Sequence, residues 1–267
     1  KNSLGMPFRP LPGSTNLLCI RETSIRDWRE AARELGRQIP YAGASANPDL
    51  PMTPNEQDDA EVFCRWLTRR DRAAGIIGPG ESYRLPTDAE WSLAAGVVEP
   101  SGAGPAELHL RDKASYPWGK TAPAPANAGN YPDGALITRW PLARVIPAYY
   151  DGHAFAAPVG SFPPNPAGFH DLGGNVWEQT RTPASAGGND VYGWRGGSWR
   201  TGASDGNWQK LLTSWRGSEA DKLLPTECGY RVLLDRNFGA GSSLLAAIRA
   251  GNTPVVRNLV ASKQGLA

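Results

Sequence analysis

Cysteine, histidine and methionine are scarce in this sequence, and long apolar runs are missing. The 267 residues include three cysteines, three histidines and two methionines. Cys19, Cys64 and Cys228 form no C-x-x-C pair and have no histidine at metal-ligand spacing, so we expect them to be small buried hydrophobes. The alternative is a single disulfide that leaves the third thiol free. No apolar stretch approaches the roughly 20 residues that a membrane span needs, so we expect no membrane-spanning segment.

A strong charge of one sign is also missing. The chain has 28 basic and 26 acidic side chains, a net charge of +2, and the basic residues are scattered among acids. A nucleic-acid binder normally carries a strong basic patch, so we expect no nucleic-acid partner. An apolar fraction of 40% allows a sizeable core, which excludes a disordered tail. The 31 glycines, 24 prolines and ten tryptophans indicate a turn-rich domain with large aromatic anchors.

The two ends of the chain suggest a larger protein. The sequence begins at Lys1, without a charged and then apolar leader, so we expect a processed product or an excised domain, tethered to further domains in a longer protein. Residues 239–267 predict a C-terminal helical hairpin that resembles an ankyrin-type repeat, which cannot bury its own apolar face. Residues 1–238 then form the main domain. The alternative is a helical hairpin docked on that domain.

The first hundred residues predict a short strand and three helices. The strand covers residues 17–23. Ser24 and Asp27 form a capping box for the first helix, which Gly36 ends. Its predicted buried face consists of Ile25, Trp28, Ala32 and Leu35.

The other two helices have similar signals. Thr53 is the predicted cap of the second helix, Pro54 its first residue and Gly75 its end. Its buried stripe comprises Ala60, Phe63, Cys64 and Leu67. The third, short helix has a capping box of Thr87 and Glu90, and turns Trp91 and Ala94 inward.

The rest of the chain is dominated by loops. Pro, Gly and Ala interrupt residues 99–162 every few positions, which is uncommon unless ions, aromatic anchors or a ligand site hold the segment. Strand-like runs return at residues 192–199 and 229–234. The sequence therefore predicts an α+β fold with its helices mostly in the first third.

A glycine turn in the sequence GFHDLGGNVWEQT (residues 168–180) indicates a site. Gly173 and Gly174 allow a tight turn, Trp177 anchors it, and Glu178 becomes a carboxylate on a rigid backbone. Backbone carbonyls beside one or two carboxylates suit a hard cation such as Ca²⁺. The alternative is a loop held only by hydrogen bonds.

Three segments in a fixed order carry a family resemblance. YRLPTDAEWSLAA (83–95), GFHDLGGNVWEQT (168–180), and RGGSW (195–199) with GYRV (229–232) resemble the formylglycine-generating enzyme, or sulfatase-modifying factor, domain family. Supporting matches lie at residues 2–12, 22–23, 63–68, 116–119 and 157–165. The resemblance covers about residues 1–235, and it implies a C-type-lectin-like α+β fold with little regular secondary structure.

The resemblance also implies one or two structural calcium ions. The ligands that it implies for one ion are Asp171, Gly174, Val176 and Glu178, with Gly174 and Val176 contributing carbonyls. Those for the other are Asn130, Tyr131, Asp151 and His153, where Tyr131 and His153 offer backbone oxygens.

The same resemblance argues against catalysis. Formylglycine-generating enzymes bind copper through two cysteines between the GGS turn and the final G-[FY]-R strand, and residues 199–227 contain none. Cys228 alone cannot supply a bis-thiolate site. Ergothioneine-type sulfoxide synthases bind iron through an additional helical domain, which is absent, and His109, His153 and His170 have no paired spacing. We therefore expect neither copper nor iron.

A binding surface remains as the predicted site. Its candidate residues are Trp199, Arg200, Asp205, Trp208, Trp215 and Arg216. Aromatic faces ringed by polar groups suit peptides, sugars or cationic groups, although such tryptophans can also be core pillars. The preferred hypothesis is a non-catalytic, calcium-stabilised domain that recognises a protein, peptide or glycan. The alternatives are a metal-dependent oxidoreductase acting on a thiol, and a variable ligand-display protein of a diversity-generating system.

Overall fold

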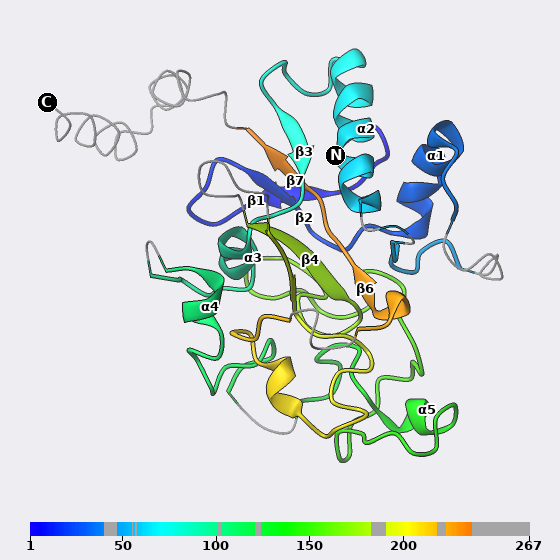
Figure 1. The fold of residues 1–267 in the computed structure, drawn as a ribbon, viewed down its shortest axis with the longest axis vertical. Coiled ribbons are helices and arrows are strands. Elements are labelled where there is room, and N and C mark those ends of the chain that lie inside the picture. Colours follow the sequence, from blue (N-terminus) through cyan, green and yellow to red (C-terminus); the bar gives the residue numbers. More distant parts are fainter. Residues whose placement is uncertain are drawn as a thin grey trace, which may run out of the picture.

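The computed structural model describes residues 1–39, 47–54, 56, 58–100, 103–120, 124–182, 191–217 and 223–236. Within these ranges, helices and two small sheets alternate with long irregular segments (Figure 1). This mixture confirms the α+β class with little regular secondary structure. The C-terminal hairpin predicted over residues 239–267 lies outside the described residues.

The first sheet is antiparallel and separates two apolar cores. Its strand order is β1-β2-β7-β3, with the bounds β1 Phe8–Pro10, β2 Leu17–Cys19, β3 Ser82–Arg84 and β7 Leu233–Asp235. Because successive side chains of a strand point to opposite faces, Leu18 and Leu233 pack on one face while Cys19 and Leu234 pack on the other. The strand predicted over residues 17–23 is confirmed at its first three residues.

Helix α1 (Ile25–Leu35) follows its local sequence signals. The Asp27 N–H donates to the Ser24 hydroxyl, and the Ser24 N–H donates to the Asp27 carboxylate at 2.8 Å. Gly36 ends the helix with a left-handed φ of 64°. Trp28 is fully buried and packs against Phe63 of α2, so the predicted capping box, helix end and core face are confirmed.

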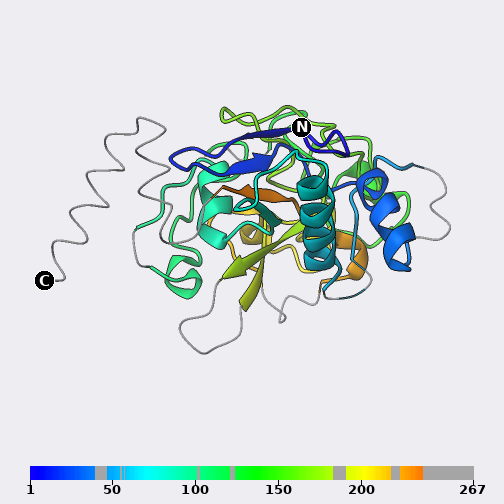
Figure 2. The same ribbon diagram turned by 90° about the horizontal axis from the view of Figure 1, so that it is seen from above.

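Helix α2 (Asp59–Ala73) begins later than predicted. The prediction of a Thr53 cap was wrong, because the segment before the helix pairs with the start of α1. Met52 donates its N–H to the Thr23 carbonyl at 2.7 Å, and Pro51 forms a bridge with Ser24. The predicted stripe of Ala60, Phe63, Cys64 and Leu67 is nevertheless buried. α1 and α2 lie together at one side of the molecule (Figure 2).

Helix α3 (Asp88–Ala94) begins at the predicted capping box. Thr87 and Glu90 exchange hydrogen bonds of 2.8 and 3.2 Å, and Arg84 of β3 holds the Glu90 carboxylate at 2.7 Å. Trp91 and Ala94 are fully buried in the second core, as predicted.

The second sheet places Glu178 at its centre. Its order is β5-β4-β6, with β4 Trp177–Thr182, β5 Val191–Arg195 and β6 Cys228–Gly229. Glu178 pairs with Arg195 on one side and with Gly229 on the other. Both predicted strand runs are shorter than expected. β5 ends where Gly196 and Gly197 take positive φ angles, and residues 229–234 are divided between β6 and β7.

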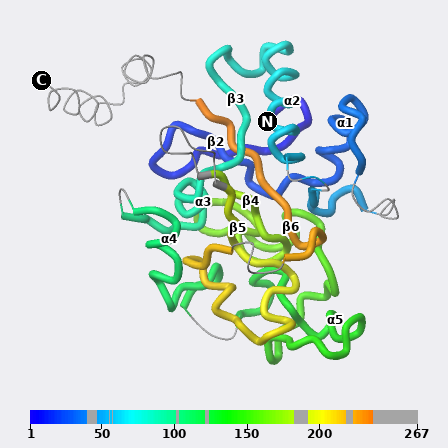
Figure 3. The backbone as a smooth tube through the Cα atoms, viewed as in Figure 1, coloured from blue at the N-terminus to red at the C-terminus, as the bar shows by residue number. Residues whose placement is uncertain are grey.

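Long loops form most of the remaining domain, as the sequence predicted. Their described parts contain single turns of helix: α4 (Pro105–Leu108), α5 (Gly134–Ile137), η1 (Trp208–Leu211) and η3 (Pro225–Glu227). Figure 3 shows these green, yellow and orange segments winding below the first sheet. Two smaller apolar cores, around Tyr131 and around Leu136, lie among them. None of the described helices is long and apolar enough to span a bilayer.

Candidate functional site

A tight turn at residues 168–178 brings the two predicted cation sites together. Asp171, Gly174 and Asn175 all have positive φ angles, of 56°, 77° and 58°. The Asn175 N–H donates to the Asn130 carbonyl at 2.9 Å, and the Asn130 side-chain amide donates to the Asn175 side-chain oxygen at 3.0 Å. The turn therefore packs directly against the segment of Asn130 and Tyr131.

This close approach requires glycine at position 174, and we expect Gly174→Ala to destabilise the fold. A Cβ there would lie 2.3 Å from the Asn130 carbonyl oxygen, and the φ angle is positive. Gly13→Ala is the matched control, because Gly13 has a φ of 71° with no atom near the added Cβ. Urea denaturation should show that Gly174→Ala loses about 1–3 kcal/mol more unfolding free energy than the control. Equal losses would contradict the packing described here.

The first predicted cation site is built from two buried carboxylates. Asp171 accepts a 2.5 Å hydrogen bond from the Gly160 N–H through Oδ2, while its Oδ1 has no partner. Burial raises the pKa of Asp171 to about 6, against the opposing effects of the Gly160 hydrogen bond and the Arg231 charge. Glu178 forms a two-pronged ion pair with the fully buried Arg231 and accepts a 2.9 Å bond from the Trp91 indole.

Glu22 is a third carboxylate of this group, and the site prediction from sequence did not include it. Its Oε2 accepts a 2.8 Å bond from the Asn175 side-chain amide, and its Oε1 is buried without a partner. Burial, followed by the charges of Asp171 and Glu178, raises the pKa of Glu22 well above its ordinary value. The only sequence signal was the Glu22-Thr23 pair, because Glu22 lies 153 residues from Asn175 along the chain.

The residues of this region fit a hard cation. Buried polar atoms are normally hydrogen-bonded, yet Asp171 Oδ1, Glu22 Oε1 and Asn130 Oδ1 have no partner. In the described ranges no three His, Cys, Asp or Glu side chains form a metal-binding group. A cation beside Asp171 would therefore depend on backbone carbonyls, the role that the family resemblance implies for Gly174 and Val176. Such a set of oxygen ligands is typical of Ca²⁺.

The second predicted site is organised around Asp151. Its two oxygens accept 2.9 Å bonds from the N–H groups of Tyr131 and His153, so the structure brings these three predicted residues together. Burial raises the pKa of Asp151 to about 7, and the nearby charge of Asp133 acts in the same direction. Asp133 is an additional residue here, because its Oδ2 accepts from the N–H groups of Asp151 and Gly152. The fourth predicted residue, Asn130, precedes Tyr131 in the chain, but its side-chain amide donates to the Phe155 carbonyl at 2.9 Å and to Asn175.

The predicted binding residues occupy several different environments. Trp199 is 6% exposed and packs with Leu136 and Ala203, and Trp208 packs against the Tyr131 core. Trp215 is half-buried with its ring edge against His109. The remaining three are polar: Arg216 is buried in ion pairs with Asp88 and Glu99, Arg200 is paired with Glu227 at 2.6 Å, and Asp205 is exposed.

Several large apolar side chains among residues 137–155, and one at position 224, are exposed instead. We call Ile137, Leu142, Tyr150, Phe155 and Leu224 the apolar face; their exposures run from 38% to 87%. The Phe155 ring stands edge-on to Trp199 at 5.2 Å.

Two chain neighbours of the apolar face, Trp140 and Thr226, also contact this core. Trp140, between Ile137 and Leu142 in the chain, packs against the Leu136–Trp199 core and lies under the Arg200 guanidinium. The Trp199 indole also donates to Thr226, two residues from Leu224. Ile137 ends the single helical turn α5 and the other four lie in irregular segments, so periodicity could not indicate them.

The family model of the sulfatase-modifying factor enzyme 1-like domain matches residues 19–236. The chain belongs to this family. The match covers every residue of the two predicted cation sites and of the apolar face.

The chain is also similar in sequence to individual proteins of the formylglycine-generating enzyme type. Inactive C-alpha-formylglycine-generating enzyme 2 of Bos taurus is 29% identical over 208 residues, 75% of this chain and 56% of that protein. Formylglycine-generating enzyme of Thermomonospora curvata is 29% identical over 141 residues, 52% of this chain and 35% of that protein. The chain thus spans about half or less of these relatives.

A solved structure confirms the fold. The structure of PvdO from Pseudomonas aeruginosa matches with a TM-score of 0.50 and 18% identity, covering 82% of this chain and 80% of that one. At this identity the likeness shows the fold alone.

The cysteines of this family member are free and buried, as the sequence predicted. Burial raises the pKa of Cys19 to about 11 and the pKa values of Cys64 and Cys228 to about 12. Cys228 lies in β6 opposite Trp177, whereas Cys19 and Cys64 belong to the core below α1 and α2. Burial therefore disfavours the charged thiolate form of each of these thiols.

Proposed function

We propose that this chain is a non-catalytic recognition domain, stabilised by one or two calcium ions, that binds a peptide or protein ligand through the apolar face. The observation that carries the proposal is the exposure of five apolar side chains, of which Phe155 contacts Trp199 directly. Surface patches of this kind mark interaction sites in soluble proteins. Three aliphatic side chains among the five favour apolar groups of a polypeptide over the hydroxyl groups of a glycan.

The chemistry of the chain supports a binding role over an oxidising one. Its three buried thiols have raised pKa values and lie in at least two separate places. The Ser198 hydroxyl, in the GGS turn, donates to Glu227 at 2.7 Å, and Arg200 pairs with the same carboxylate. The name of the Bos taurus relative, an inactive C-alpha-formylglycine-generating enzyme 2, is consistent with a non-catalytic member.

Peptide selection tests the recognition role directly. We expect a random peptide library to yield ligands for the wild-type chain, and the double variant Leu142→Ser/Phe155→Ser to lose at least about tenfold in affinity for them, because hot-spot side chains each contribute above 1 kcal/mol. Fluorescence anisotropy with one selected peptide is the measurement.

The matched control is Ile76→Ser/Val98→Ser. Ile76 and Val98 are 45% and 86% exposed, close to the 52% and 87% of Phe155 and Leu142, but belong to other surfaces. The control should keep wild-type affinity. An equal loss in both double variants would contradict recognition by the apolar face, and copper-dependent oxidation of a cysteine peptide would contradict the non-catalytic part.

A further inference from the structure

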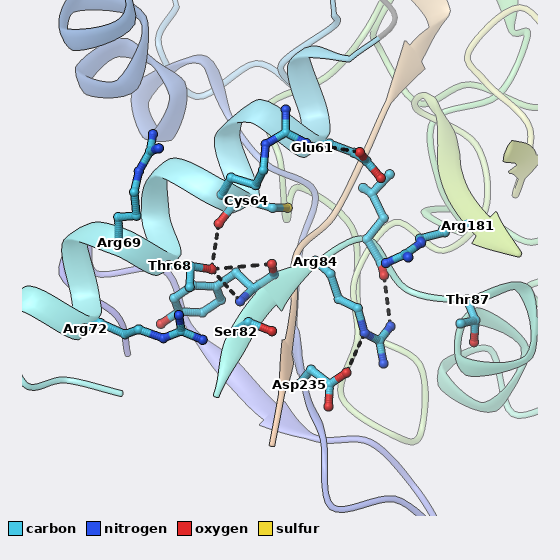
Figure 4. Close-up of a pocket in the computed structure, with 13 residues that line it drawn as sticks. Glu61, Cys64, Thr68, Arg69, Arg72, Ser82, Arg84, Thr87, Arg181 and Asp235 are labelled. Carbon is cyan, nitrogen blue, oxygen red and sulfur yellow. Dashed lines mark hydrogen bonds and ion pairs between the residues drawn. The ribbon is translucent and has the colours of Figure 1, made fainter. Parts of the chain in front are cut away.

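A concave surface lies between α2, β3 and β4 (Figure 4). It is a cleft of about 780 Å³. Five arginines line it, and together they define what we call the arginine cleft: Arg65, Arg69, Arg72, Arg84 and Arg181. Figure 4 shows Arg69 and Arg72 extending from α2, while Arg84 and Arg181 come from the strand side. The tertiary fold therefore concentrates positive charge that is scattered in the sequence.

Two of the three arginines on the helix side of the cleft have no acidic partner among the described residues. Arg65, Arg69 and Arg72 follow i, i+4, i+7 spacing, so they share one face of α2 and all three are exposed. Like charges at this spacing destabilise a helix. The charge of Arg65 is offset by an ion pair with Glu61 at 3.2 Å. Arg72 donates hydrogen bonds to the Glu81 carbonyl. Within the described part of the chain, Arg69 has no hydrogen-bond or ion-pair partner.

The helix dipole accounts for only part of this charge. A cation in the last turn is favourable near the negative end of a helix, which explains Arg72 and Arg70. Arg65 and Arg69 lie before that turn, so the dipole does not explain them.

The strand side is rigid and less charged. Arg84 is held by Glu90 at 2.7 Å and by Asp235 at 2.7 Å, so its charge is already compensated. The backbone N–H of Arg181 donates to Pro86 at 2.9 Å, which fixes β4 beside the start of α3. Arg69 and Arg72, which have no acidic partner among the described residues, therefore lie along α2 and face the strand side.

Two common recognition modes do not fit the cleft. Strand addition at β3 is blocked, because the Tyr83 N–H donates to the Thr68 hydroxyl at 2.8 Å. Stacking of bases or sugars requires an exposed ring, whereas Tyr83, the aromatic side chain in this lining, is 5% exposed and donates its hydroxyl to Asp71. Recognition by arginine side chains remains.

We propose that the arginine cleft binds an extended acidic peptide segment of a partner protein. Guanidinium groups match carboxylates with paired hydrogen bonds. Seven residues separate Arg65 from Arg72, a rise of about 10 Å along the helix. Same-side side chains of an extended peptide are about 6.6–6.8 Å apart, so two successive carboxylates can reach this row. This surface is independent of the apolar face and of the calcium sites.

The probe is a fluorescein-labelled peptide of alternating glutamate and serine, with a glutamine–serine peptide for comparison. Fluorescence anisotropy on the whole chain should show binding of the acidic peptide that weakens as salt increases. Arg69→Gln/Arg72→Gln should weaken binding about tenfold or more, because each charged hydrogen bond lost is worth more than a neutral one. The variant alters two exposed side chains, and its melting curve checks that it folds.

The matched control is Arg29→Gln/Arg33→Gln, which removes the same charge from exposed positions on α1. The control should bind as the wild type does. Equal weakening in both double variants would overturn the proposal, because it would reflect net charge alone. Absence of binding at low salt, or full displacement by inorganic phosphate at an equal concentration of negative charge, would overturn it as well.

Discussion

Replacing Arg231 with methionine is expected to reduce the unfolding free energy by about 3–5 kcal/mol, the range for breaking a buried ion pair. Arg231 is fully buried, and its guanidinium holds Glu178 and also donates to the carbonyls of Cys19 and His170. Its loss leaves Glu178 beside two more buried carboxylates, Glu22 and Asp171. Urea denaturation in chelator is the measurement.

Arg195→Met is the comparison for this prediction. Arg195 is also fully buried, and it pairs with Asp88 at 2.6 Å, but Asp88 retains a second partner, Arg216, at 2.9 Å. The Asp88 carboxylate therefore stays paired after the substitution, and we expect a smaller loss. A larger loss for Arg195→Met than for Arg231→Met would show that the acidic group around Glu178 is not dependent on Arg231.

Removing calcium is expected to lower the melting temperature of the chain. A ligand that binds only the folded state adds about 2.7 kcal/mol of stability at a hundredfold excess over its Kd. The unpartnered oxygens of Asp171, Glu22 and Asn130 provide the reason to expect such a ligand. Scanning calorimetry with EDTA and then with excess calcium is the measurement, and elemental analysis should find calcium without copper or iron.

Substitution of single carboxylates tests the calcium prediction at each predicted site. Asp171→Asn and Asp151→Asn should each reduce the calcium-dependent shift, because each removes a charged oxygen of one predicted site. Asp112→Asn is the control: this exposed carboxylate also accepts backbone hydrogen bonds, from Ala114 and Ser115, but lies outside both sites. An unchanged melting curve in excess chelator would refute calcium stabilisation.

The arginine cleft and the apolar face differ in the chemistry that they offer to a ligand. The apolar face suits a hydrophobic ligand, and the cleft carries uncompensated cations on Arg69 and Arg72. Variants of one surface leave the other intact, so the two binding experiments can fail separately.

The sequence alone determined the features that depend on neighbouring residues. The capping boxes of α1 and α3 lie within four residues of chain, so Ser24 with Asp27 and Thr87 with Glu90 announced both helix starts. The glycine turn at residues 173–174 and the loop-rich character of residues 99–162 could also be predicted from the sequence. The order of the motifs also pointed to the family, because this order can be read along the chain without knowing which residues contact each other.

Only the tertiary structure decided the features that join distant residues. Helix α2 starts at Asp59 because Pro51 and Met52 pair with residues 23–24, a competition that local capping signals do not report. Arg231 meets Glu178 across 53 residues, and Glu22 meets Asn175 across 153. The apolar face consists of Ile137 at the end of α5 and four side chains from irregular segments, so no period in the sequence reveals it. Long-range contacts of this kind exist only once the chain has closed its loops, and for that reason the grouping of charges and exposed apolar residues had to be observed in the folded domain.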